Sequence, residues 1–154
     1  MKLGFKKVHP DAVIPKYAHE GDAGMDVCAV EDVELPLNEP KIVKTGLVAE
    51  IPTGYEIQVR PRSGLAVKGV TVWNVPGTID SGYRGEIGVI LVACKGNSIM
   101  ESQFLSPLGR LFKINKGDRI AQLVVAPVTR CVPVEIEAVS KTERGTGGFG
   151  STGI

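Results

Sequence analysis

Polar and apolar residues alternate along much of this chain with the two-residue period of a β-strand that has one buried face. The clearest example is Tyr-Glu-Ile-Gln-Val-Arg at 55–60, and the pattern returns at 134–138. Residues 87–94 and 119–128 are almost wholly apolar, which is typical of strands covered on both sides. Further strands are predicted at 3–8, 42–51 (bent at Gly46) and 70–73, and a loop leads into another at 22–29.

No stretch of ten or more residues has the apolar period of an amphipathic helix. One short helix is expected at 62–68, with Ser63 as a candidate N-cap. The 19 glycines and 10 prolines indicate many turns. With 154 residues and neither a repeat nor an interdomain linker, the pattern predicts one all-β domain over 1–154. We expect a jelly-roll-like barrel or sandwich with little helix.

The composition argues against several classes of function. A formal net charge of +1 gives no electrostatic reason to expect nucleic acid or an acidic membrane as the main partner. Three cysteines without CxxC spacing are expected to be free, buried thiols in a reducing compartment: Cys28, Cys94 and Cys131. With only His9 and His19, a zinc site is not expected. The first residues lack an apolar leader, and the longest apolar run has eight residues, so a cytoplasmic protein is predicted.

The segment 77–86 carries the first candidate chemistry. Its three glycines permit tight turns, and between them stand Asp80 and Tyr83, three residues apart. One interpretation is a hairpin that holds a ligand. The other is a surface turn in which Asp-Ser-Gly satisfies its own backbone. These residues alone leave both interpretations open.

Two other segments suggest a phosphorylated ligand. Arg62 is followed by Ser63 and Gly64, and a glycine-rich end at 144–153 contains Arg144. That end lacks the lysine and the helix of a P-loop, and it could equally be a disordered tail. Carboxylates in glycine-rich surroundings imply a divalent cation or an activated water, and the candidates are Asp26, Asp80 and Asp118. With both histidines in the first 19 residues, direct attack of water on phosphorus is favoured over a nucleophilic side chain.

Five motifs in order resemble those of the trimeric dUTP diphosphatases (dUTPases), over nearly the whole chain. They are Ala-Gly-Met-Asp-Val at 23–27, Pro-Arg-Ser-Gly-Leu-Ala at 61–66, the segment 77–89, Gly-Asp-Arg-Ile-Ala-Gln-Leu at 117–123 and the glycine-rich end. Met25 departs from the aromatic or small apolar residue frequent in the family, a change expected to be tolerated. The resemblance implies a jelly roll and a homotrimer in which each active site draws on three chains.

The resemblance also implies roles for individual residues. Asp80 would orient and activate the attacking water and contact the 3′-hydroxyl, and the ring of Tyr83 would pack against the deoxyribose. Backbone groups at 74–79 and 83–87 would read uracil, and Phe149 would stack on it. The implied substrate-binding residues are Arg62, Ser63, Gly64, Asn74, Gly77, Ile79, Tyr83, Glu86, Ile87, Gln122, Arg144, Phe149, Gly150, Ser151 and Thr152. Mg²⁺ would be held through triphosphate oxygens and water. Asp26 would be structural, or would contact the metal's ligands rather than the metal itself.

The implied reaction is hydrolysis of dUTP to dUMP and pyrophosphate by attack of water on the α-phosphorus. It would limit uracil incorporation into DNA and supply dUMP for thymidylate synthesis. The alternatives are a dCTP deaminase-like enzyme of the same fold and a regulatory protein that binds a protein partner. Such a partner would use residues 95–113, which are longer than expected and are predicted to be an insertion. The simpler interpretation is a hairpin extension packed on its own subunit. Residues 144–154 are predicted to be a mobile arm.

Overall fold

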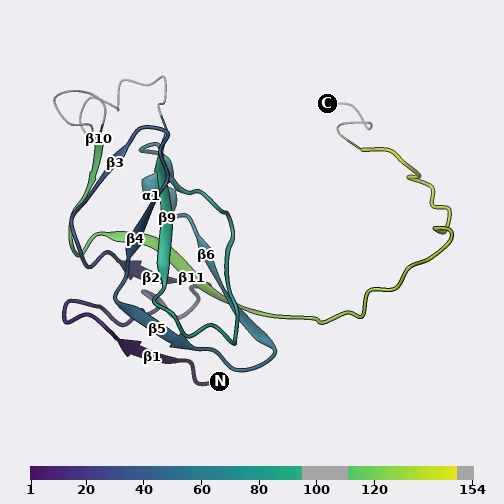
Figure 1. The fold of residues 1–154 in the computed structure, drawn as a ribbon, viewed down its shortest axis with the longest axis horizontal. Helices are drawn as coiled ribbons and strands as arrows, with labels where there is room; N and C mark the ends of the chain where they lie inside the picture. The colour runs from purple at the N-terminus through teal and green to yellow at the C-terminus, as the bar shows by residue number, and fades with distance from the viewer. Residues whose placement is uncertain (95–110, 149–154) are drawn as a thin grey trace.

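The computed structural model describes residues 1–94 and 111–148 (Figure 1). This part of the chain contains eleven strands and one short helix. They are β1 (Gly4–Lys7), β2 (Met25–Cys28), β3 (Val33–Pro36), β4 (Lys41–Lys44), β5 (Leu47–Glu50), β6 (Tyr55–Arg60), α1 (Ser63–Ala66), β7 (Val70–Val72), β8 (Gly77–Ile79), β9 (Gly88–Ala93), β10 (Leu111–Ile114) and β11 (Arg119–Pro127). The structure describes no helix that is long and apolar enough to cross a membrane.

The strands form small antiparallel sheets around one core. The largest has the order β2-β11-β6-β8, a second has the order β4-β9-β7, and β1 pairs with β5 and β10 with β3. Strands adjacent in the sheets are mostly distant in the sequence, as in a jelly roll. The predicted all-β, jelly-roll-like class with little helix is confirmed.

Strand β9 lies at the centre of its sheet and confirms the expectation of a strand covered on both sides. Three consecutive residues, Leu91, Val92 and Ala93, are at most 2% exposed, although their side chains point alternately to opposite faces. Both faces are therefore packed against apolar neighbours, and burial of this kind supplies most of the driving force for folding.

The segment predicted as one bent strand at 42–51 is two strands, β4 and β5, joined by a turn at Gly46. The φ of Gly46 is +66°, and a Cβ there would lie 2.6 Å from Cβ of His9. Only glycine combines that dihedral with so close a neighbour. The predicted cap at Ser63 is wrong: α1 begins after Arg62, whose extended backbone occupies the N-cap position, and no side chain caps the helix.

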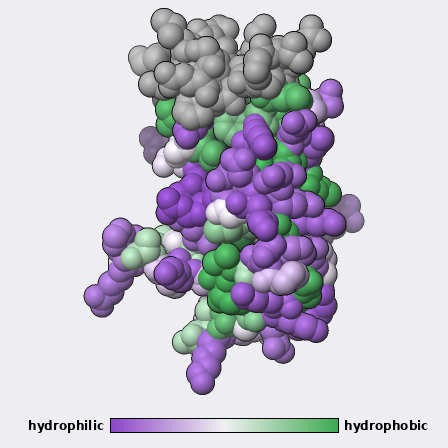
Figure 2. Space-filling model, turned by 90° about the vertical axis from the view of Figure 1, so that its left-hand side faces the viewer, coloured by the Kyte–Doolittle hydropathy of each residue, from purple (hydrophilic) through white to green (hydrophobic). Residues whose placement is uncertain are grey.

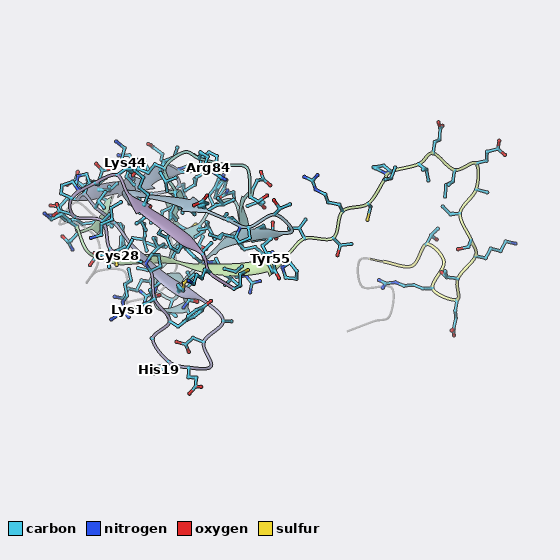
Figure 3. The ribbon with its side chains drawn as sticks, turned by 90° about the horizontal axis from the view of Figure 1, so that it is seen from below. Lys16, His19, Cys28, Lys44, Tyr55 and Arg84 are labelled. Carbon is cyan, nitrogen blue, oxygen red and sulfur yellow. The ribbon has the colours of Figure 1, made fainter. Side chains whose placement is uncertain are left out.

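Beyond β11 the chain leaves the body as an extended arm, residues 128–148 (Figure 1). The alternation at 134–138 does not produce a strand here, because no strand of the described residues lies beside the segment. Val128 and Arg130 still line a pocket of the body. Val132, Val134 and Ile136 are 86%, 75% and 61% exposed, and the side chains of this later part of the arm stand clear of the body (Figure 3).

The structure tests the prediction for the three cysteines, and it describes only part of the predicted insertion. All three cysteines are free, but the expectation that they are buried is wrong: Cys94 and Cys131 are exposed, and Cys28 is only half-buried. Cys94 follows the end of β9, and Cys131 lies on the arm. Of the predicted insertion at 95–113, residues 95–110 lie outside the described residues, and 111–113 belong to β10.

Candidate active site

A tight hairpin turn places Asp80 directly after β8. Strand β8 pairs with β6, and the amide of Tyr83 then donates to the carbonyl oxygen of Asp80 at 3.0 Å, closing the turn. The guanidinium of Arg84 donates to the carbonyl oxygens of Ser81 and Tyr83 at 2.7 and 2.8 Å. The turn is therefore held from both its backbone and one of its own side chains.

This turn borders a pocket of about 170 Å³, called here the hairpin pocket. Its lining consists of Thr78, Ile79, Asp80, Tyr83, Glu86, Ile87 and Gly88. The carboxyl-bearing residue Asp80 and the ring of Tyr83 are both exposed, and the Tyr83 hydroxyl donates to the carbonyl oxygen of Glu86 at 3.0 Å. A concave pocket with an exposed acid and an aromatic wall favours the ligand-holding interpretation of 77–86 over the simple surface turn.

Two further predicted residues lie at the start of this hairpin. Gly77 is buried, and a Cβ there would lie 3.2 Å from the side-chain nitrogen of Asn74. Asn74 and Gly77 therefore lie side by side at the entry to β8, where a larger residue at 77 would push against Asn74.

A second group forms where the first, second and fourth motifs meet. In the large sheet, Gln122 of β11 is paired with Asp26 of β2 on one side and with Arg60 of β6 on the other. The Asp26 carboxylate accepts from Nε of Arg62 at 2.8 Å and from Nη1 of Arg119 at 3.1 Å. Asp26 thus places two guanidinium groups beside each other.

These guanidiniums face a pocket of about 380 Å³, called here the basic pocket. Four cationic side chains and one carboxylate line it: Arg62, Lys68, Lys113, Arg119 and Asp118. The excess of positive charge suits an anionic ligand such as a phosphate chain. Two more predicted phosphate-binding residues, Ser63 and Gly64, are exposed on α1 immediately after Arg62.

The three candidate aspartates have different environments. Asp80 lines the hairpin pocket. Asp26 is engaged by two arginines, and Asp118 accepts from the backbone amide of Asn115 at 2.8 Å, which stabilises the turn before β11. Of these three, Asp80 has the geometry of a group that acts on a bound ligand.

One chain does not bring all the predicted residues together. The hairpin pocket and the basic pocket share no lining residue. Arg144 lies on the arm, where its Nε donates to the carbonyl oxygen of Gly147 at 2.9 Å, and the arm runs away from the body (Figure 1). The predicted residues Phe149, Gly150, Ser151 and Thr152 lie outside the described residues.

Comparison with known proteins decides the family. The dUTPase family model matches residues 10–103 and 104–153. The chain belongs to the dUTPase family. Deoxyuridine 5′-triphosphate nucleotidohydrolases from Gloeothece citriformis and from a Picosynechococcus species are 48% and 51% identical to it. These alignments cover 100% and 99% of this chain, and 98% and 99% of the relatives.

Solved dUTPase structures share the fold. A mutant dUTPase of Staphylococcus bacteriophage 80alpha, solved with dUpNHpp, has a TM-score of 0.82 and 32% identity, with 99% of each chain covered. A mutant of the dUTPase from phage phi11 of S. aureus has a TM-score of 0.72 and 28% identity, covering 90% of this chain and 98% of that one. That phi11 structure is described as coordinating a structural Mg(II) ion.

The donor atoms of this dUTPase suit a magnesium ion that is held mainly by its nucleotide. Within 1–94 and 111–148 no three His, Cys, Asp or Glu side chains gather as a metal cage. Mg²⁺ is commonly bound through one or two carboxylates together with substrate phosphates and water. The cationic lining of the basic pocket suits the phosphates through which such an ion would be held.

Cys28, beside Asp26 on β2, does not offer a nucleophile. Burial raises the pKa of the Cys28 thiol above its ordinary value of 9.0, and the Asp26 carboxylate raises that pKa further. The thiol therefore stays protonated near neutral pH, and protonated thiols are poor nucleophiles.

Sequence reasoning missed three residues that hold the dUTPase hairpin in place. Arg84 stands within the third motif, but nothing in its spacing indicates the two carbonyl groups that it binds. Thr45 and Gly46 bond to Ile87 and Glu86 near the end of the motif, which follow them by 42 and 40 residues. Gly46 could be predicted as a bend but not as a contact of the pocket.

Proposed function

We propose that this dUTPase hydrolyses dUTP to dUMP and pyrophosphate in the hairpin pocket, with Asp80 as the catalytic residue. The observation that carries the proposal is the exposed carboxylate at the rim of a pocket whose other wall is the Tyr83 ring. Membership of a family whose relatives are dUTP nucleotidohydrolases supports it. The dCTP deaminase alternative is not favoured, since the matching relatives are dUTP hydrolases.

Asp80 acts on the attacking water. Its carboxylate accepts a proton from the water as the oxygen bonds to the α-phosphorus, and the bond from that phosphorus to the bridging oxygen of the β-phosphate breaks. Pyrophosphate leaves with the bridging oxygen, and dUMP stays in the hairpin. Because the turn is fixed by Arg84, the carboxylate is held before the substrate arrives.

The hairpin also selects the nucleoside. The Tyr83 ring, fixed by its hydroxyl on the Glu86 carbonyl, packs against the deoxyribose and leaves no room for a 2′-hydroxyl. Backbone groups at 74–79 and 83–87 read the uracil edge. A pocket that uses buried backbone groups rejects a wrong base by leaving those groups unpaired.

The phosphate chain is held by Arg62, Ser63, Gly64 and Gln122. The ion pair with Asp26 points the Arg62 guanidinium into the basic pocket. When bound, Mg²⁺ neutralises charge on the phosphates, which eases attack by water. The ligands for that ion would come from the nucleotide and water, because Asp26 is already paired with Arg62 and Arg119.

The active enzyme is a homotrimer in which different chains supply the hairpin, the basic pocket and the arm. This accounts for the separation of these three elements within one chain. It also accounts for the exposed apolar side chains of the arm and for the apolar patches on the surface in Figure 2. We also propose a reducing compartment such as the cytoplasm, in which the exposed thiols of Cys94 and Cys131 would stay unpaired.

Replacement of the carboxylate tests the proposal. Asp80→Asn should lower kcat for dUTP by about 10²–10⁴-fold, the usual contribution of a general base, and leave dUTP binding nearly unchanged. Pyrophosphate release measures turnover with dUTP, UTP, dTTP and dCTP, with and without Mg²⁺, and calorimetry measures binding. Near-normal turnover in Asp80→Asn would refute the role of Asp80. Release of ammonia from dCTP would instead indicate the deaminase.

A further inference from the structure

The two walls of the hairpin pocket are held in different ways. Residues 78–79 belong to β8 and are fixed by the ladder with β6. The opposite wall, residues 83–87, lies outside the ladders formed by the described residues, and pairing resumes only where Gly88 meets Lys44. Other contacts must therefore fix the wall that carries Tyr83.

The turn 45–47, made of the two residues between β4 and β5 and the first residue of β5, supplies these contacts. The Thr45 hydroxyl donates to the carbonyl oxygen of Ile87 at 2.6 Å, and the Ile87 amide donates to the carbonyl oxygen of Leu47 at 2.7 Å. The Gly46 amide donates to the Glu86 carboxylate at 2.8 Å. Three consecutive residues of the turn thus bind two consecutive residues of the wall.

Thr45 has a hydroxyl where the core would accept a methyl group. It is fully buried, and within residues 1–94 and 111–148 it is the one buried polar or charged side chain. A valine of the same shape would avoid the cost of burying a hydroxyl. The hydroxyl instead meets a backbone carbonyl of the pocket wall, so its partner belongs to the active site.

The contacts continue from the turn to the ring of Tyr83. The carboxylate of Glu86 is bound to Gly46, and its carbonyl oxygen accepts from the Tyr83 hydroxyl. Glu86, which the family resemblance implies as a substrate-binding residue, therefore has its carboxylate engaged with the protein's own backbone. Displacement of residues 86–87 would move the acceptor that fixes the ring.

We infer that the turn 45–47 is a positioning clamp for this wall. Thr45 and Glu86 act as positioning residues that set the place of the Tyr83 ring and hence the choice between deoxyribose and ribose. The inference rests on the proposed function of the hairpin pocket, and it assigns a role in selectivity to a turn outside the five motifs.

Two substitutions of Thr45 and one control outside the clamp test the inference. Thr45→Val keeps the side-chain shape and removes the donor, and Thr45→Ser keeps the donor. We expect Thr45→Val to lower the ratio of kcat/KM for dUTP to that for UTP by about tenfold, because a misplacement of about 1 Å can cost up to about 100-fold. Thr45→Ser should keep most of the wild-type ratio. Thr71→Val, on β7 and outside the pocket lining, is the matched control and should leave the ratio unchanged.

Thermal unfolding is measured first, and all assays run well below the lowest midpoint. Loss of folded protein lowers both rates equally and leaves their ratio unchanged. A wild-type ratio in folded Thr45→Val overturns the inference, and so does a lowered ratio that Thr45→Ser shares. If the valine variant does not fold, Thr45→Ala, which admits water to the Ile87 carbonyl, replaces it with the same expectation. A wild-type protein that does not turn over dUTP would contradict the proposed function instead.

Discussion

Gly85 controls the place of the Tyr83 ring through the absence of a side chain. A Cβ at position 85 would overlap the hydroxyl and ring atoms of Tyr83, whereas a Cβ at Gly82, in the same turn, would meet nothing within 4 Å. Gly85→Ala must therefore displace the ring and break its hydrogen bond to Glu86. We expect kcat/KM for dUTP to fall by about 10–100-fold in Gly85→Ala. Gly82→Ala should remain near wild type, and equal losses in the two variants would contradict this explanation.

Asp26 is predicted to act through Arg62. Its carboxylate is about one-fifth exposed and binds two guanidiniums, so Asp26→Asn removes the charge that orients them. The Michaelis constant for dUTP should rise several-fold with a smaller change in kcat, because Arg62 is proposed to contact phosphates in substrate and transition state alike. The control is Asp11→Asn, which breaks an exposed pair with Lys116 and should change neither constant. A fall in kcat at unchanged KM would refute this role.

At the scale of elements, the sequence predicts the strands whose own polar and apolar residues are enough to define them. The sequence predicts β6, β9 and β11 to within about one residue of their ends, since alternation or continuous apolar sequence is enough to identify them. It does not predict β3, β8 and β10. β8 is only Gly-Thr-Ile, and it is a strand because β6 lies beside it, which no local pattern records.

The same limit applies to the active site. Asp80 and Tyr83 could be named as candidates because they lie three residues apart between glycines, although that spacing also fits a surface turn. The structure places both in one pocket. Thr45 could not be predicted, because its hydroxyl donates to a carbonyl oxygen 42 residues away. The sequence around it has the pattern of an ordinary strand. Residues 134–138 have the alternation of a strand but no partner strand among residues 1–94 and 111–148. A strand of another chain would supply such a partner.

At the scale of the whole molecule, the arm is the feature that a single chain leaves unexplained. An extended segment with alternating apolar side chains can add to the edge of another subunit's sheet and carry its glycine-rich end to that subunit's active site. Removal of residues 144–154 should then abolish most turnover while leaving the trimer intact, since 128–143 remain. Light scattering gives the mass. A trimer that dissociates on this truncation would show that the end is structural.

Mixing two inactive chains tests whether the arm and the hairpin of one site come from different subunits. Asp80→Asn supplies intact arms, and the chain truncated before Arg144 supplies intact hairpins. Co-expressed chains that assemble at random should give about one quarter of sites with both parts, because each part is intact in half of the chains. Pyrophosphate release from dUTP should therefore recover to about a quarter of wild type, while either variant alone stays inactive. If each arm closed over its own hairpin, every site would lack one part, and mixed trimers of confirmed composition would show no recovery.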